Sequence, residues 1–324
     1  MLKDTFGREI RYLRLSITDR CNLRCRYCLP EPASFLPAGD LLTAEELLLV
    51  CEQAAYLGID SFRLTGGEPL IRPDCASLIA ALRRLPGVSR VALTTNGVLL
   101  GERLGELLTA GLDAVNIHLD TMDPAQYAAI SGSDALDEVL DAIRQAAPRL
   151  PVKINCVVQR GVNEEAPLAL ATLARDWPVD VRLIELMPVG AAKTLDTVPN
   201  ETVLARLEAA YGKGEPDDTV RGDGPAVYWC LPGFAGRIGL ISAVHARFCD
   251  QCSRLRLTAA GELKPCLCYA DTVPLRPILR DSAPGREERV REAILQAVRA
   301  KPRAHTFERR EQVTENRSMA QIGG

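Results

Sequence analysis

Three cysteines, Cys21, Cys25 and Cys28, stand in the spacing C-x3-C-x2-C within one short segment of the chain. Cysteines this close in sequence can converge on one metal centre, and thiolates are the usual ligands of iron–sulfur clusters. A four-iron cubane normally takes four thiolates, so its fourth iron would be ligated from elsewhere or left open to chelate a substrate. An incomplete zinc site or a chance group of buried thiols is the alternative, although zinc prefers four closed ligands and no histidine is nearby.

A second group follows near the C-terminal end, where Cys249, Cys252 and Cys266 have the spacing C-x2-C-x13-C and Cys268 stands two positions later. Two such pairs on a hairpin are also typical of a zinc ribbon, although the C-x-C pair suits that geometry less well. Spacing alone therefore leaves zinc and an iron–sulfur cluster equally open.

Composition places these groups in an ordinary globular chain. The 324 residues are 47% hydrophobic and 25% charged, which suits one large domain with an appendage or two domains. The net charge of -3 argues against broad binding to nucleic acid or to an anionic membrane. No apolar run resembles a signal peptide or a membrane span, and the eleven cysteines are an odd number. We therefore expect a cytoplasmic protein whose cysteines bind metal rather than form disulfides.

Short strand-like segments alternate with longer helical ones between positions 12 and 187. The predicted strands are Tyr12–Thr18, Ser61–Gly66, Arg90–Thr95, Ala114–Asp120, Val152–Val158 and Asp180–Met187. The predicted helices are Thr43–Leu57, which begins with a possible capping box at Thr43 and Glu46, then Cys75–Leu85, Glu102–Ala110, Leu136–Ala147 and Glu164–Trp177. This order predicts parallel strands joined by helical crossovers, as in an α/β barrel or a doubly wound sheet.

Alternation along the strands separates an apolar face from a polar one. Leu13 and Leu15 alternate with Arg14 and Ser16 in the first strand, and the second, fourth and fifth strands repeat the pattern with Arg63, Asn116, His118, Asp120, Lys153 and Asn155 on the polar face. The sixth strand breaks this parity. A complete barrel fills its interior with apolar side chains, so we expect a partial barrel whose lumen holds a large polar ligand. A sheet with one solvated face is the alternative.

The composition changes to glycine, proline and aspartate around Gly212–Gly224, which indicates a domain boundary. We expect one domain over residues 1–213 and a second region over residues 214–324. The second region should hold strands at Val227–Leu231, Arg237–Val244 and Arg254–Thr258 and a helix at Glu287–Ala300. From about Glu308 to Gly324 the chain is polar and has the character of a tail.

The first cysteine group, with Tyr27 before its last cysteine, resembles the signature of the radical S-adenosylmethionine (SAM) superfamily. Thr65-Gly66-Gly67-Glu68-Pro69 resembles the GGEP motif of the same superfamily. Within it, the chain is similar to the GTP 3',8-cyclases of molybdenum cofactor biosynthesis. That resemblance rests on the second cysteine spacing, on Arg254-Leu255-Arg256, on segments Tyr12–Arg20, Thr94–Gly97 and Arg182–Pro188, and on the terminal Gly323-Gly324.

The resemblance implies an α/β fold, a partial (β/α)6 radical SAM barrel with a smaller C-terminal α+β region that carries a second Fe-S cluster. It implies two [4Fe-4S] clusters, held by Cys21, Cys25 and Cys28 and by Cys249, Cys252 and Cys266, with SAM as a further cofactor. It places Tyr27, Gly66, Gly67, Glu68, His118 and Met187 at SAM, and Arg14, Arg63, Thr94, Lys153, Arg254 and Arg256 at GTP, with Arg182 a further candidate. Gly323 and Gly324 would reach into the active site and share in catalysis with the cluster cysteines, Arg254 and Arg256.

Two positions depart from the family pattern. His118 stands where the family has a serine that contacts SAM, and Cys268 is an additional thiol beside the expected ligand Cys266. The SAM contact at His118 and the role of Cys268 are therefore in doubt.

The implied reaction begins with a 5'-deoxyadenosyl radical that removes the 3' hydrogen of GTP, after which C3' attacks guanine C8. An external electron donor would supply the electron, and a cyclic pyranopterin monophosphate synthase would receive the product. The resemblance leaves a monomer or a homodimer open, with no nucleic-acid or membrane partner. The competing interpretations are a radical SAM peptide-modifying enzyme and a zinc-binding interaction module.

Overall fold

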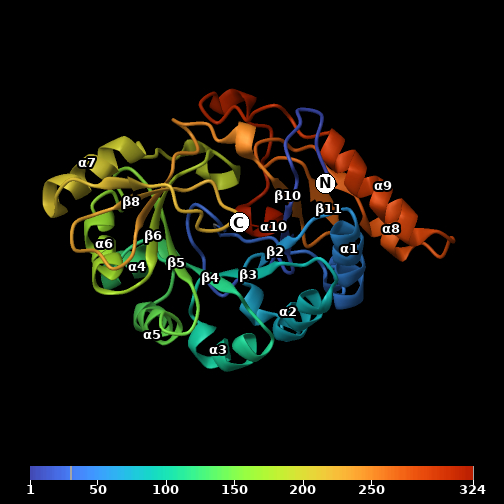
Figure 1. The fold of residues 1–324 in the computed structure, drawn as a ribbon, viewed down its shortest axis with the longest axis horizontal. Coiled ribbons are helices and arrows are strands. Elements are labelled where there is room, and N and C mark those ends of the chain that lie inside the picture. The colour runs from blue at the N-terminus through green and yellow to red at the C-terminus, as the bar shows by residue number, and fades with distance from the viewer. Residues whose placement is uncertain (30, 324) are drawn as a thin grey trace.

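The computed structural model describes residues 1–29 and 31–323, and within them six parallel strands form the centre of the fold. These strands are β1 (Tyr12–Ser16), β2 (Ser61–Thr65), β3 (Arg90–Thr95), β4 (Ala114–His118), β5 (Val152–Val158) and β6 (Asp180–Glu185). Helices cover their outer side, namely α1 (Ala44–Tyr56), α2 (Cys75–Arg84), α3 (Leu100–Thr109), α5 (Leu136–Ala146) and α6 (Ala166–Asp176) (Figure 1). The predicted partial (β/α)6 barrel is confirmed.

The helix and strand bounds follow the sequence pattern closely. Strands β3 and β5 have the predicted bounds, and the other four end one or two residues early. The capping box of α1 is present, since Glu46 N donates to Thr43 Oγ1 at 3.2 Å and Thr43 N donates to Glu46 Oε2 at 2.8 Å.

Within the described residues four helices were missed: α4 (Pro124–Ser131), α7 (Asn200–Tyr211) and the short α8 (Arg276–Arg280) and α10 (Met319–Ile322). Small residues give α4 no one-sided apolar stripe, so helical periodicity could not reveal it. The spacing of Val203 and Leu207 before Gly212 was a usable signal for α7.

The polar face of the strands lies inside the molecule. Arg63, Lys153 and Arg182 are 5%, 6% and 5% exposed. The apolar face, which includes Leu13 and Leu15, packs in the core under the outer helices. The alternative of a solvated sheet face is therefore wrong.

The break in parity at the sixth strand has a structural reason. Arg182 keeps the inward register, because it pairs with Asn155 of β5. Glu185 is fully buried and accepts hydrogen bonds from the backbone N–H groups of Asn200 at 3.1 Å, Val244 at 2.8 Å and His245 at 3.0 Å. This carboxylate ties the end of β6 to the C-terminal region.

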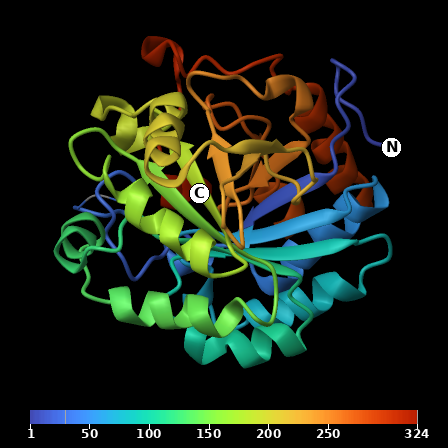
Figure 2. The same cartoon turned by 60° about the vertical axis from the view of Figure 1, so that its left-hand side comes forward.

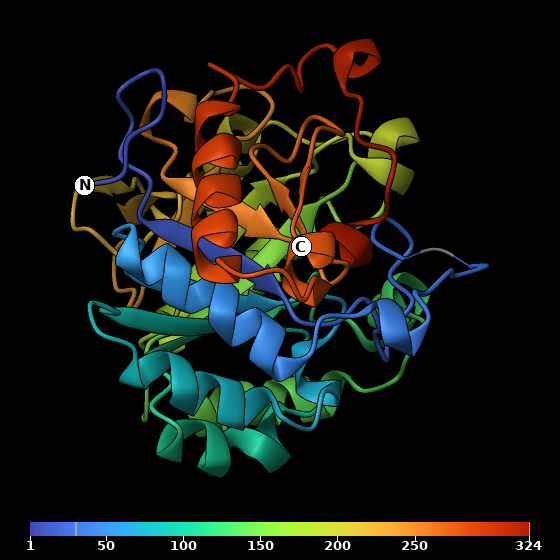
Figure 3. The same cartoon turned by 90° about the vertical axis from the view of Figure 1, so that its right-hand side faces the viewer.

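Strands of the C-terminal region extend both edges of the central sheet. Beyond β6 lie β9 (Ile238–Ile241), β8 (Val227–Cys230) and β7 (Glu215–Asp217), and beyond β1 lie β10 (Arg254–Leu257), β11 (Glu262–Lys264) and β12 (Val273–Pro274). The helix α9 (Arg286–Arg299), preceded by α8 (Arg276–Arg280), lies beside α1 (Figure 3). The division at residues 213 and 214 stays a prediction.

Short 3-10 turns complete the secondary structure, at Ala38–Asp40, Pro69–Ile71, Gly190–Thr194, Cys249–Gln251 and Arg310–Gln312. Among the helices of the described residues, none has the length and apolar character needed to cross a membrane.

The final segment is packed into the fold, and its description as a polar tail is wrong. Val313, Glu315 and Ile322 are 3%, 1% and 0% exposed, and the short helix α10 (Met319–Ile322) brings the chain end to the concave side of the sheet (Figures 1 and 2). The Glu315 carboxylate forms ion pairs with Lys264 and Arg317. Apolar and ionic contacts together fix the path of this segment.

We expect Glu315→Gln to lower the free energy of unfolding by about 3–5 kcal/mol, because it leaves the buried Lys264 ammonium without its carboxylate. The two cations outweigh burial and lower the pKa of Glu315 to about 2. The stabilisation should be complete above about pH 4.5 and disappear as the pH falls towards 2, since the unfolded chain then binds more protons. Chemical denaturation of the metal-free chain measures it. Glu311→Gln, on the exposed side of the same segment, should have no effect, and equal stability of the two variants would refute the prediction.

Candidate active site

The first cysteine group lies in the loop that follows β1. Cys21, Cys25 and Cys28 are partly exposed, whereas Cys51, Cys75 and Cys156 are buried. Burial raises the pKa of Cys28 to about 12 with a contribution from Cys21, and burial, followed by Cys28, raises that of Cys25. The three thiols are therefore near enough to repel one another when ionised.

Nearby N–H groups point to the sulfur of Cys21. Leu23 N donates to its Sγ at 3.4 Å and Asn96 Nδ2 at 3.8 Å. In residues 1–29 and 31–323 no three His, Cys, Asp or Glu side chains enclose a point at the distances of a single metal ion. The fit therefore rests on the chemistry of the donor atoms. Burial and mutual repulsion keep the three neighbouring thiols protonated, and a cationic metal cluster would displace these protons and bind the thiolates.

The Gly-Gly-Glu-Pro turn packs directly against the backbone that leads into this loop. Gly67 N donates to Thr18 O at 2.8 Å and Glu68 N donates to Arg20 O at 2.7 Å. A Cβ atom on Gly66 or Gly67 would lie 2.2 Å from the carbonyl oxygen of Thr18 or Arg20 respectively. Both glycines are needed here for contact between two backbone segments.

Glu68 joins the same turn to the end of β3. Its carboxylate is fully buried and accepts hydrogen bonds from Leu70 N at 2.9 Å, Thr95 Oγ1 at 2.8 Å and Asn96 N at 2.7 Å. Burial raises its pKa to about 7. These hydrogen bonds tie the glycine turn to the residues at the end of β3.

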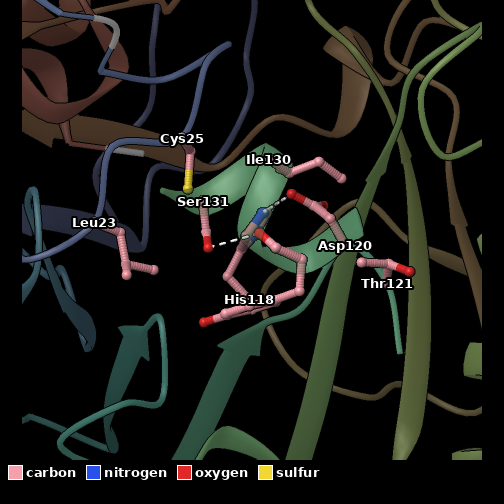
Figure 4. A pocket seen from close by; sticks show the side chains of 8 residues that line it. Leu23, Cys25, His118, Asp120, Thr121, Ile130 and Ser131 are labelled. Carbon is pink, nitrogen blue, oxygen red and sulfur yellow. Dashed lines mark hydrogen bonds and ion pairs between the residues drawn. The ribbon is translucent and has the colours of Figure 1, made fainter. Parts of the chain in front are cut away.

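His118 and Asp120 form a hydrogen-bonded group with Tyr27 of the first cysteine loop. Tyr27 donates to Asp120 Oδ2 at 2.9 Å, His118 Nε2 lies 3.1 Å from the same oxygen, and Tyr27 OH also contacts His118 Nε2. Burial lowers the pKa of His118, but the Asp120 carboxylate outweighs it and raises that pKa. Figure 4 shows His118 and Asp120 lining a small pocket together with Cys25.

Cationic side chains lie side by side on the inner face of the sheet. Arg14 of β1 is paired in register with Arg63 of β2 on one side and with Arg256 of β10 on the other. Burial, together with the neighbouring charges of Arg14 and Arg254, lowers the pKa of Arg256 to about 9. Such a concentration of positive charge suits an anionic ligand.

A second cationic position lies across the sheet at Lys153. Burial, followed by Arg182, lowers the pKa of Lys153 to about 7. Its Nζ donates to the Tyr228 hydroxyl at 3.0 Å and to the carbonyl oxygen of Arg221.

Two buried oxygens lie on neighbouring strands between these cationic groups. Thr94 Oγ1 and Asn116 Oδ1 come from paired positions on β3 and β4, and within the described residues neither atom has a hydrogen-bond partner. Buried polar atoms are normally satisfied, so a polar ligand suits this position.

The chain end reaches the arginines. Arg256 Nη1 donates to Gly323 O at 2.6 Å, and Gly323 packs against Ser16 and Thr65. Met187 packs in the small apolar cluster that also holds Ile322. The predicted site residue Gly324 lies outside the described residues.

The second cysteine group lies near β10 and β11. Burial raises the pKa of Cys266, whereas Arg254 and Lys301 outweigh burial at Cys252 and lower its pKa to about 6. The backbone N–H of His305 donates to Cys249 Sγ at 3.3 Å. Cys268 is fully buried with its Sγ 3.6 Å from Thr306 Oγ1.

Comparison with known proteins gives matches along the whole chain. A family model for the radical SAM superfamily matches residues 15–174, and one for Molybdenum Cofactor Synthesis C matches residues 179–307. The GTP 3',8-cyclases of Clostridium perfringens (strain 13) and Moorella thermoacetica are 39% and 42% identical over 325 and 328 residues. Each alignment covers 100% of this chain and 100% of the relative. The chain belongs to the GTP 3',8-cyclase family.

A solved structure supports the fold of this family member. Streptococcus suis SuiB bound to S-adenosylmethionine has a TM-score of 0.62 and 14% sequence identity, over 87% of this chain and 68% of SuiB. At this identity the likeness shows a common radical SAM fold and nothing about the substrate.

The structure brings the predicted site residues together on the concave side of the sheet, in two neighbouring groups. The first cysteine loop, the glycine turn and His118 lie at the carboxyl ends of the strands, and the arginines lie along the inner face. Sequence reasoning did not single out Asp120 and Asn116 as site residues. Both lie on the polar face of the fourth strand segment, which was a usable signal.

We expect Gly67→Ala to displace the first cysteine loop, because the added Cβ meets the backbone oxygen of Arg20 rather than a movable side chain. Stability should fall by about 1–3 kcal/mol, as in other overpacked sites, and iron uptake at the first cysteine group should be lost. Gly105→Ala is the control, since nothing lies within 4 Å of its Cβ and alanine favours the helix. Equal iron content in the two variants would contradict this reading of the turn.

Proposed function

We propose that this chain is a radical SAM GTP 3',8-cyclase. It converts GTP to (8S)-3',8-cyclo-7,8-dihydroguanosine 5'-triphosphate, the first step of molybdenum cofactor biosynthesis. The observation that carries the proposal is the row of Arg63, Arg14 and Arg256 on the inner face, with the chain end against it, in a chain similar over its full length to GTP 3',8-cyclases.

Two iron–sulfur clusters and SAM are the cofactors of this family. We assign the first [4Fe-4S] cluster to Cys21, Cys25 and Cys28. When bound, it supplies the electron that cleaves SAM into methionine and a 5'-deoxyadenosyl radical. The neighbouring N–H donors Leu23 N and Asn96 Nδ2 would stabilise the thiolate of Cys21.

The residues around this loop would hold SAM. Gly66, Gly67 and Glu68 fix the turn beside the cluster loop through backbone contacts and the buried carboxylate. Asp120 holds both Tyr27 and His118, and it lines a pocket together with His118 and Cys25. Met187 lies near the chain end. His118, at the position of the family serine, bonds to Asp120 and Tyr27.

The inner face would bind the triphosphate and ribose of GTP. Arg14, Arg63 and Arg256 form one cationic row, with Arg254 on the same strand as Arg256 and with Lys153 and Arg182 across the sheet. Guanidinium groups give bidentate contacts to phosphate oxygens. The buried oxygens Thr94 Oγ1 and Asn116 Oδ1 would form hydrogen bonds with the ligand.

The remaining assignments concern the second cluster and the chain end. Cys249, Cys252 and Cys266 would hold a second [4Fe-4S] cluster that binds the purine. Gly323 and Gly324 would complete the active site, since Gly323 already accepts a hydrogen bond from Arg256. We further propose a cytoplasmic enzyme, a monomer or a homodimer. It would take its electron from an external donor and pass its product to a cyclic pyranopterin monophosphate synthase.

Anaerobic reconstitution with iron and sulfide, followed by SAM, reductant and GTP, tests this function by mass analysis of the products. 5'-Deoxyadenosine and a cyclised isomer of GTP should form together. Arg256→Ala should lose GTP consumption while Arg299→Ala, at an exposed arginine, should not. Formation of 5'-deoxyadenosine without GTP consumption would leave the superfamily in place and refute the substrate, and zinc in place of iron would favour a structural metal site.

GTP affinity should fall as the pH rises through about 7, because Lys153 loses its proton near that pH in the free chain. A bound triphosphate favours the charged lysine, so the affinity should decline by up to about tenfold per pH unit above this pKa. Lys153→Met should remove this part of the pH dependence, and the exposed Lys213→Met should retain it. Calorimetric titration with GTP between about pH 6 and 9 measures both slopes. A Lys153→Met slope equal to that of the parent chain would rule out this role.

A further inference from the structure

Lys301 is a buried lysine that none of the assignments above uses. It lies one residue beyond Ala300, the C-cap of α9, and is 4% exposed. Lysines are almost never buried without a partner. In the part of the chain that the structure describes, the partners of the Lys301 ammonium include no carboxylate. Its partners are instead groups around the second cysteine group.

The ammonium group makes three contacts, which matches its three N–H donors. Its Nζ donates to Arg254 O at 2.6 Å, to Pro265 O at 2.9 Å and to Cys252 Sγ at 3.8 Å. Arg254 stands two residues after Cys252, and Pro265 immediately precedes Cys266. One side chain therefore joins the two segments that carry these cysteines.

The residues that follow Lys301 contact the third thiol. His305 N donates to Cys249 Sγ at 3.3 Å. Arg8 donates to Cys249 O at 2.8 Å and to Pro302 O at 2.6 Å, which links this segment to the same cysteine. Segment 301–305 thus forms the outer layer of the second cysteine group.

We propose that Lys301 is a positioning residue for the second cluster. Its side chain holds the Cys252 and Cys266 segments together and donates an N–H···S hydrogen bond to the Cys252 sulfur. The inference rests on the proposed assignment of a cluster to Cys249, Cys252 and Cys266. Hydrogen bonds to sulfur and nearby charge both tune such clusters. Because reduction adds negative charge, the adjacent cation favours the reduced cluster as well as its retention.

The test uses the full chain with Cys21, Cys25 and Cys28 replaced by alanine, so that iron reports on the second group alone. Lys301→Met keeps the length of the side chain but removes its charge and donors. Iron loss to a chelator should become about tenfold faster or more, in line with other outer-layer contacts of metal sites. The midpoint potential of the cluster, measured by electron paramagnetic resonance during redox titration, should become more negative.

Two variants distinguish charge from packing. Lys301→Arg should stay close to the parent in both measurements, and the exposed Lys213→Met should match the parent. Lys301→Gln retains N–H donors but not the charge, so it should also make the midpoint potential of the cluster more negative. It provides a second neutral variant in case Lys301→Met does not fold. Unchanged retention and potential in both neutral variants would overturn the inference, as would failure of Lys301→Arg to restore them. Absence of iron from the parent with intact Lys301 would instead refute the cluster assignment.

Discussion

The rest of this structure depends on one constraint, which is that several positively charged side chains lie close together on the inner face of the sheet. Arg14, Arg63 and Arg256 occupy paired positions on three neighbouring strands, where burial weakens their hydration and each repels the next. Such an arrangement is stable only where other interactions hold the strands in register and where anionic groups can approach. The apolar outer face, packed under the helices, supplies the first of these conditions.

The C-terminal region helps both to hold the strands in register and to form the cationic inner face. Its strands extend the sheet at both edges, so that β10 brings Arg256 beside Arg14 and β9 lies beside Arg182 of β6. Its final segment is anchored by the buried pair of Lys264 and Glu315 and ends with Gly323 at the guanidinium of Arg256. Segments far apart in sequence thereby share one cationic interior.

Close backbone contact organises the other end of the site. The glycine turn lies against Thr18 and Arg20 with no room for a Cβ atom, and Glu68 connects that turn to Asn96, whose side chain contacts Cys21. The cysteine loop therefore depends on the ends of three strands. His118 and Asp120 add a contact from β4 through Tyr27.

The sequence by itself determined the six barrel strands and the five helices that cover them, the polar inner face and the two cysteine groups, because periodicity and local spacing express local geometry. It could not determine that the strands around Ile238 and Arg254 join opposite edges of the sheet, or that the final segment packs inside, since these depend on long-range pairing. Nor could it reveal Lys301 beside Cys252, or Asp120 holding both Tyr27 and His118. Burial and hydrogen bonds between distant segments arise only when the whole chain is folded, and they decide which polar residues become part of the site.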